Sequence, residues 1–252
     1  MASWSARKYG YLLIFVAAVA AIIVIPAYFL FHKAPTCFDG IQNGGETGID
    51  CGGPCARLCP ADYAAPKVLW SYSIQVVPGV YNALAYVENS NPTVEAPAVP
   101  YLFRLYDAQG GFIAERSGST FVPAGQPFAV FEGGIETGNR IPAATTFEFT
   151  SLPQWRVGSV LTALRTVDAN LVQGPSPKAE IDVQNMSVDQ TFSNVDAVIV
   201  LYDKDNNRVS FSKTVIDSIG PGETKTLYYT WPAAFPESIV RTEVLYIAHP
   251  QQ

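Results

Sequence analysis

Two patterns of apolar residues divide the chain. Residues 10–31 form a continuous apolar run without a charged side chain, whereas the chain after residue 66 alternates apolar and polar positions. A helix rises about 1.5 Å per residue, so a run of this length spans the roughly 30 Å hydrocarbon core of a bilayer. The run is apolar on every side rather than along one stripe, which predicts a membrane span and not a buried core helix. The alternating part predicts half-buried β-strands.

The flanks of the apolar run predict its orientation. The run is longer than the apolar region of a cleaved signal peptide, which is about 7 to 15 residues, so we expect an uncleaved anchor. Arg7 and Lys8 precede the run, and Lys33 alone follows it before the acidic positions begin. The excess of positive charge before the span places the N-terminus in the cytoplasm. The expected protein therefore has a cytoplasmic tail at 1–9, a single plasma-membrane span at 10–31 and an extracytoplasmic remainder.

Composition narrows the function of the outer part. The formal net charge of the chain is −6, which makes nucleic acid a poor partner. Charged residues make up only 15% of the chain, while glycine and proline number 19 each. This balance argues against disorder and favours short strands joined by turns. We find no long amphipathic helical pattern after residue 60, so the outer part is expected to be all-β.

A cysteine-rich collar is expected at residues 32–62. It holds every cysteine of the chain: Cys37, Cys51, Cys55 and Cys59. Outside the membrane, two disulfides are the natural state of four cysteines, and the sequence does not choose among the three pairings. A structural zinc ion held by the four thiolates is the alternative.

Oxygen-bearing side chains lie on a glycine-rich path between the first two cysteines. They are Asp39, Asn43, Glu46 and Asp50. Hard oxygen ligands of this kind suit Ca²⁺, which makes these four residues a candidate calcium site. Their spacing does not match the twelve-residue calcium loop, and Asp and Asn also cap turns by accepting hydrogen bonds from nearby backbone. The sequence leaves both explanations open.

This segment resembles a short cysteine-rich motif of exported and surface-anchored prokaryotic proteins, C-x-D-G-x-x-N-x-x-E-T-x-x-D-C-G-G-x-C. Residues 37–55 match it at every specified position. The resemblance covers about a tenth of the chain. It implies exposure in a cell envelope and no enzymatic activity.

An internal repeat follows the linker at residues 60–66. ALAYVENS at 83–90 matches AEIDVQNM at 179–186, and FRLYDAQGG at 103–111 matches IVLYDKDNN at 199–207, both with an offset of 96 residues. The chain therefore contains a duplicated unit of about 95 residues.

Each unit predicts an immunoglobulin-like β-sandwich, because alternating strands are joined by regular turns over this length. The expected domains are 63–152 and 153–252. The Phe103-x-Leu-Tyr-Asp107 signature resembles the FxLYD family of immunoglobulin-like domains, although Ile199 replaces Phe in the second copy. That resemblance implies a prokaryotic surface protein without catalytic chemistry. The predicted fold is all-β: two tandem sandwiches after a transmembrane helix and a disulfide-rich segment.

One predicted strand, AVIVLY at 197–202, is apolar on both faces. Ile199 and Leu201 would face the core of their own sandwich. Val198, Val200 and Tyr202 would then face outward, which predicts a covered outer surface. Packing between the two domains or a protein partner could cover it, and so could neighbouring long side chains.

Histidine content argues against an enzyme. The two histidines are His32, beside the membrane, and His249, near the end of the sequence, so no Ser-His-Asp or Cys-His set can form within a sandwich. Asn185-Met-Ser187 is a glycosylation sequon, a triplet that is also common by chance.

The expected protein is a non-catalytic scaffold or adhesion element, anchored by one span in a cell-envelope assembly and bound to other envelope proteins. The alternative is a calcium-dependent module that binds glycan or peptide. Aromatic side chains converging in one groove would favour binding, and a broad apolar outer sheet would favour assembly.

Overall fold

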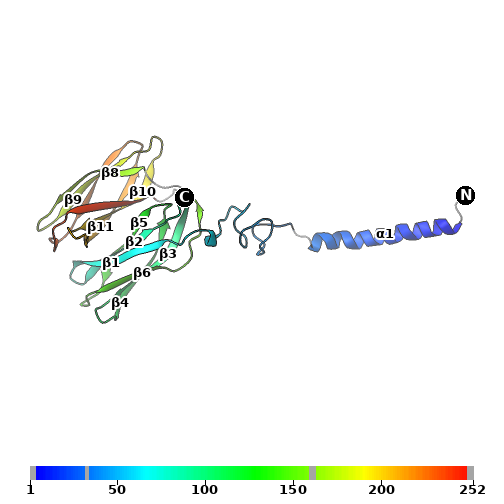
Figure 1. Ribbon diagram of the computed structural model, residues 1–252, viewed down its shortest axis with the longest axis horizontal. Coiled ribbons are helices and arrows are strands. Elements are labelled where there is room, and N and C mark those ends of the chain that lie inside the picture. The colour runs from blue at the N-terminus through cyan, green and yellow to red at the C-terminus, as the bar shows by residue number, and fades with distance from the viewer. Residues whose placement is uncertain (1–3, 32–33, 159–162, 249–252) are drawn as a thin grey trace. The chain divides into compact units, whose positions relative to one another are not determined.

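The computed structural model describes residues 4–31, 34–158 and 163–248. Figure 1 shows the long N-terminal helix, a segment with little regular structure after it, and the β-sheets that follow. Met1–Arg57 form one compact unit and Leu58–Gln252 form another. His32 and His249 lie outside the described residues.

The apolar run forms a single helix, α1 (Trp4–Phe31), as the sequence predicts. Within α1, Lys8–Tyr28 is long and apolar enough to cross a membrane, and none of this stretch is buried by the rest of the chain. An apolar surface on all sides of a helix of this length is typical of a membrane span. The orientation of the helix and the identity of the membrane stay predictions.

The first sandwich follows a short 3-10 helix, η1 (Pro60–Asp62). Its strands are β1 (Lys67–Val77), β2 (Val80–Glu88), β3 (Val94–Tyr106), β4 (Phe112–Val122), β5 (Pro127–Glu136), β6 (Ala144–Phe149) and β7 (Arg156–Val157). They form an antiparallel sheet β1-β2-β5 and a second sheet β4-β3-β6, with β7 paired to β3. Val94 of β3 lies opposite Val157 of β7, so strand pairing carries the first sandwich five residues past the expected boundary at 152.

The second sandwich has the same order of strands. They are β8 (Leu164–Val172), β9 (Lys178–Asn185), β10 (Phe192–Tyr202), β11 (Arg208–Ile219), β12 (Thr224–Thr230) and β13 (Arg241–Ala248). One sheet is β12-β9-β8 and the other is β11-β10-β13. The first, second and fifth strands of each sandwich thus share one sheet, and the third, fourth and sixth share the other. The all-β sandwich fold is therefore as predicted.

Alternation along the strands builds the two cores. In β9, Ala179, Ile181 and Val183 are buried and their neighbours are not, which confirms the predicted period of two. Buried side chains from both sheets fill each sandwich, including Phe103 and Phe128 in the first. Each fully buried side chain of this size contributes about 1.5–3 kcal/mol, so the sandwiches hold together without an internal disulfide.

A buried asparagine occupies the same place in each sandwich. The side-chain amide of Asn89 donates to the carbonyls of Val94 (2.9 Å) and Pro123 (2.7 Å), and its Oδ1 accepts from the backbone N–H of Asn91 (3.0 Å). Since Asn89 is 1% exposed, these bonds satisfy polar groups that water does not reach.

The same bonds recur 96 residues later. The amide of Asn185 donates to the carbonyls of Gln190 (2.7 Å) and Ile219 (3.2 Å), and its Oδ1 accepts from the N–H of Ser187 (2.9 Å). Asn185 is fully buried. Its side chain is therefore a structural tie and, in the folded chain, is not accessible to glycosylation at the sequon.

The hairpin turns also repeat. Oδ1 of Asp107 accepts from the N–H groups of Gln109 and Gly111, and Oδ1 of Asp203 accepts from those of Asp205 and Asn207. The Arg140 guanidinium is the largest influence that holds the pKa of Asp107 below its usual value, and the Asn207 side-chain amide is the largest for Asp203; the backbone bonds add to both. Both turns are thus capped by aspartate.

The two sandwiches pack against each other through their outer faces. Sheet β1-β2-β5 lies against sheet β11-β10-β13, and the buried residues between them are Leu84, Ala129, Val198, Val200, Tyr202, Phe211 and Leu245. Phe131 meets Phe211 edge-on, with ring centroids 6.2 Å apart. Strand β10 is consequently buried on both faces: Ile199 and Leu201 belong to its own core, and the alternate side chains belong to this interface.

A cluster of polar side chains beside the apolar interface adds hydrogen bonds, which depend on direction as apolar contacts do not. The Tyr86 hydroxyl of the first sandwich donates to Glu243 Oε1 (2.7 Å), and the Tyr202 hydroxyl donates to Glu243 Oε2 (3.0 Å). The Arg241 guanidinium lies 3.5 Å above the Tyr202 ring. Burial, helped by Glu243, raises the pKa of Tyr202 to about 12, so its hydroxyl stays a donor at neutral pH. The Tyr86–Glu243 bond joins the two sandwiches, and Tyr202 and Arg241 hold the Glu243 carboxylate from its own sheet.

We expect Asn185→Ala to destabilise the second sandwich by about 2–4 kcal/mol, because it leaves buried carbonyl and N–H groups without partners. Urea unfolding of the micelle-embedded protein, followed by tryptophan fluorescence, measures the change. Asn170→Ala, at an exposed strand position, is the control and should shift stability by less than about 0.5 kcal/mol. Equal stabilities for the two variants would show that the buried amide is not a structural tie.

Candidate functional site

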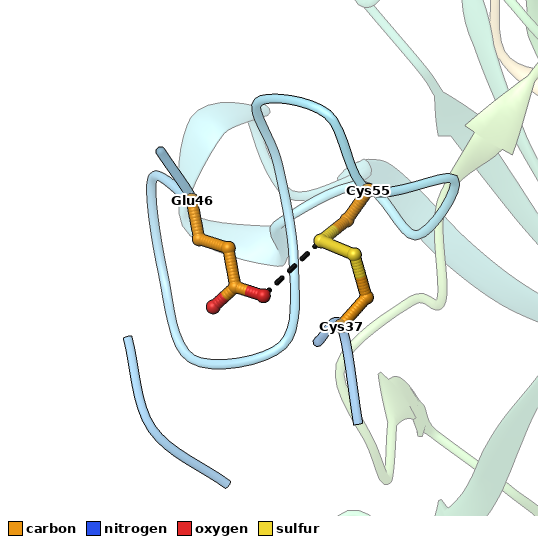
Figure 2. A group of neighbouring side chains, drawn as sticks. All are labelled: Cys37, Glu46 and Cys55. Carbon is orange, nitrogen blue, oxygen red and sulfur yellow. Dashed lines mark hydrogen bonds between the residues drawn. A yellow bond between two sulfur atoms is a disulfide. The ribbon is translucent and has the colours of Figure 1, made fainter. Parts of the chain in front are cut away.

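The four cysteines are all disulfide-bonded, as expected. Cys37 bonds Cys55 with an S–S distance of 2.02 Å (Figure 2). Cys51 and Cys59 are disulfide-bonded as well, and no described cysteine is free. Because the sulfurs are oxidised, none is a thiolate that could hold the alternative zinc ion.

Glu46 lies directly beside the Cys37–Cys55 disulfide. Its Oε1 is 3.2 Å from Cys55 Sγ, the pair of atoms joined by the dashed line in Figure 2. A disulfide sulfur carries no proton, so this is a close approach of a carboxylate oxygen to sulfur and not a donated hydrogen bond. Glu46 is 9% exposed and Cys55 is 6% exposed.

The other acidic side chains of the segment cap its turns. Asp50 accepts from the N–H groups of Asp39 (2.9 Å, to Oδ1) and Gly40 (3.0 Å). Asp39 accepts from the N–H of Ile41 and from the side-chain amide of Asn43, both at 3.0 Å. The bond from Asn43 is the largest influence that keeps the pKa of Asp39 below its usual value. Turn capping was one of the two explanations that the sequence left open.

The candidate calcium ligands do not meet at one point. Among the described residues, the acidic, cysteine and histidine side chains whose ligand atoms gather within 4.8 Å of one another are Cys37, Glu46 and Cys55. The two sulfurs of that group are bonded to each other. The carboxylate oxygens of Asp39 and Asp50 accept hydrogen bonds from backbone N–H groups. Asn43 Oδ1 is buried and has no hydrogen-bond partner among the described residues. Calcium binding by these four residues stays a prediction.

The outward face of β10 is covered by the chain itself. Val198 and Val200 are fully buried and Tyr202 is 4% exposed, all against the first sandwich. Of the explanations offered by the sequence, packing between the domains is the one found here. In this arrangement the three side chains do not face a separate partner.

A groove lies where the two sandwiches adjoin, with a volume of about 400 Å³. Its aromatic lining is Tyr72, Tyr81, Phe211, Trp231 and Phe235, and amides of Gln75 and Asn82 also border it. None of its lining residues is charged. Trp231 Nε1 is buried and has no hydrogen-bond partner among the described residues.

Sequence reasoning did not find this groove. Its lining comes from β1, β2 and the loop before β6 in the first sandwich, and from β11, the end of β12 and the loop after it in the second, so segments far apart in the sequence meet there. The run Trp231-Pro-Ala-Ala-Phe235 was the available signal, because aromatic residues in a proline-containing loop often line a binding surface.

No protein-family model and no curated protein sequence matches the chain. Solved structures show low similarity. Red sea bream transglutaminase has a TM-score of 0.23 and 10% identity, over 75% of this chain and 32% of its own. A β-glucuronidase of glycoside hydrolase family 2 has a TM-score of 0.21 and 12% identity, over 88% of this chain and 26% of its own.

The tandem CBM22-1–CBM22-2 domain of Xyn10C from Paenibacillus barcinonensis has a TM-score of 0.18 and 11% identity, over 74% of this chain and 85% of its own. The chain thus spans about a third or less of the two enzymes and most of the tandem domain. At these TM-scores the similarities carry no argument about function.

Proposed function

We propose that the protein is a non-catalytic scaffold or adhesion element, anchored in a plasma membrane by α1 with its N-terminus in the cytoplasm. Its two sandwiches are tandem copies of one immunoglobulin-like unit of the FxLYD type, and other envelope proteins are its partners. The observation that carries the proposal is the apolar interface between the sandwiches, and we expect it to hold them as one rigid body.

The recurring hydrogen bonds support a duplication. Asn89 and Asn185 bond to groups that lie 96 residues apart in the two copies, as do Asp107 and Asp203. A buried asparagine that bonds three separate backbone groups depends on the whole local fold, so its recurrence favours two copies of one ancestral unit.

Each sandwich has one sheet whose outer face is not part of the interface. At positions equivalent to the apolar interface residues, these outer faces carry charged side chains. Val200 pairs with Phe211 in the interface, whereas the equivalent pair in the first sandwich is Arg104 with Glu115. Their side chains are 35% and 55% exposed and form an ion pair, with a second between Arg104 and Glu148 (2.7 Å).

The opposite sheet shows the same contrast. Leu84 pairs with Phe131 in the interface, and the equivalent pair in the second sandwich is Glu180 with Tyr228. Charged side chains resist burial without a matched partner, which disfavours stacking of a further sandwich on these faces. The chain is thus suited to act as one rigid arm of defined length rather than as part of a polymer.

A second candidate function is binding of a glycan or peptide. The aromatic, uncharged groove favours it, since such linings suit neutral ligands with apolar faces. The groove does not include the candidate calcium residues, so binding there would not require Ca²⁺ at those positions.

Val200→Arg should separate the sandwiches, because it places the charge found at Arg104 inside the apolar interface. Nitroxide labels at Ser117→Cys and Ala169→Cys report the distance between the sandwiches by pulsed electron resonance. We expect a narrow distribution in the parent and a broad one in the variant. Val215→Arg, at a position 47% exposed, is the control and should stay narrow. A broad distribution in the parent would contradict a rigid arm.

In intact cells we expect the sandwiches to be cut by added protease while cytoplasmic marker proteins survive. The four cysteines should not react with a permeant maleimide until a reductant is added. Crosslinking in the same cells should join the chain to a defined set of envelope proteins. Protected sandwiches, free thiols or an absence of crosslinked partners would each contradict the proposed role.

The ligand-binding candidate is tested by calorimetric titration of the micelle-embedded chain with maltohexaose, chitohexaose and a neutral proline-rich decapeptide. If the groove binds one of them, Tyr72→Ala should weaken the affinity at least about fivefold. Tyr228→Ala removes a 65% exposed tyrosine outside the groove and should leave affinity unchanged. No binding by any probe, or equal loss in the two variants, argues against this candidate.

A further inference from the structure

The Glu46 carboxylate is held in one orientation against the Cys37–Cys55 disulfide. Its Oε2 accepts from the N–H of Asp50 (3.1 Å) and, at longer range, from the N–H of Asn43 (3.5 Å). Its Oε1 is left facing Cys55 Sγ at 3.2 Å. These hydrogen bonds from the backbone therefore fix the orientation of the Glu46 carboxylate.

The two sulfurs differ in access. Cys55 is 6% exposed, with Glu46 Oε1 3.2 Å from its sulfur, whereas Cys37 is partly exposed. Reduction of a disulfide begins with a thiolate that attacks one sulfur in line with the S–S bond. The accessible route is attack on Cys37, which makes Cys55 the leaving group.

Negative charge then develops beside a charge that is already present. The reductant sulfur bonds to Cys37 Sγ, the Cys37–Cys55 bond breaks, and its electron pair leaves on Cys55 Sγ next to Glu46 Oε1. Attack on Cys55 itself would instead bring an anionic thiolate to the carboxylate. Both routes place like charges together in a partly desolvated site, which raises the barrier.

We propose that the Glu46 carboxylate protects the Cys37–Cys55 disulfide from reduction by thiolates, through electrostatic repulsion. The disulfide is a lasting structural bond of the segment, and the buried carboxylate keeps it closed when thiols are present. This role does not depend on the scaffold function or on which side of a membrane the segment lies.

The size of the effect follows from the distance. At an effective dielectric constant of about 20, a partial charge on the leaving sulfur a few ångströms from a full charge changes the rate by about tenfold or more. Glu46→Gln keeps the shape and the acceptor for Asp50 but removes the charge. Glu46→Asp keeps the charge but loosens the contact with the backbone.

The test is the rate of reduction of the full chain in micelles by dithiothreitol, with thiols trapped by N-ethylmaleimide and located by mass spectrometry. In the balanced reaction, dithiothreitol forms a mixed disulfide with Cys37, Cys55 leaves as a thiolate and takes a proton from water, and the second dithiothreitol thiol closes to release Cys37. The disulfide gains two electrons, and dithiothreitol becomes its cyclic disulfide.

We expect Glu46→Gln to speed the appearance of thiols at Cys37 and Cys55 at least about tenfold, and Glu46→Asp to change it less than about threefold. Cys51 and Cys59 are the internal control and should react at the parental rate. A parental rate in Glu46→Gln would overturn the proposal. So would equal acceleration at all four cysteines, because that indicates a loosened segment and not a lost charge.

Discussion

The apolar contact between sheet β1-β2-β5 and sheet β11-β10-β13 is the constraint on which the arrangement of the two sandwiches depends. It removes water from the outer faces of two sheets that would otherwise expose large apolar side chains. Each fully buried valine, leucine or phenylalanine side chain contributes about 1.5–3 kcal/mol. The contact therefore outweighs the conformational entropy lost when the chain between the sandwiches is held in one arrangement. The bond from Tyr86 to Glu243 adds a directional contact across this apolar interface, and the Tyr202 hydroxyl holds Glu243 from its own sheet.

The contact explains which parts of the arrangement could be predicted from sequence. The AVIVLY segment shows that both faces of β10 are covered, because burial leaves an apolar pattern at both parities. The pattern does not say what covers them. That information lies in Leu84 of β2 and Ala129 of β5, whose strands are also buried on both faces at these positions, and in Tyr86, 157 residues away from Glu243. Long-range pairing of this kind leaves no local signal.

In the cysteine-rich segment, too, some features could be predicted from the sequence and others could not. The number and setting of its cysteines predict disulfides, but Cys37–Cys55 is one of three equivalent choices until the glycine turns bring the sulfurs together. From the sequence, the acidic residues could be metal ligands or turn caps. In the structure, Asp39 and Asp50 accept hydrogen bonds from backbone N–H groups. That Glu46 instead faces a sulfur depends on which backbone N–H groups hold its other oxygen.

Scanning calorimetry of the full chain in micelles tests most directly whether the sandwiches are one body. The account predicts a single cooperative unfolding transition for both, whose calorimetric enthalpy equals its van't Hoff enthalpy, because neither sheet can expose its outer face without exposing its partner's. Two separate transitions, each with the enthalpy of one sandwich, would contradict it.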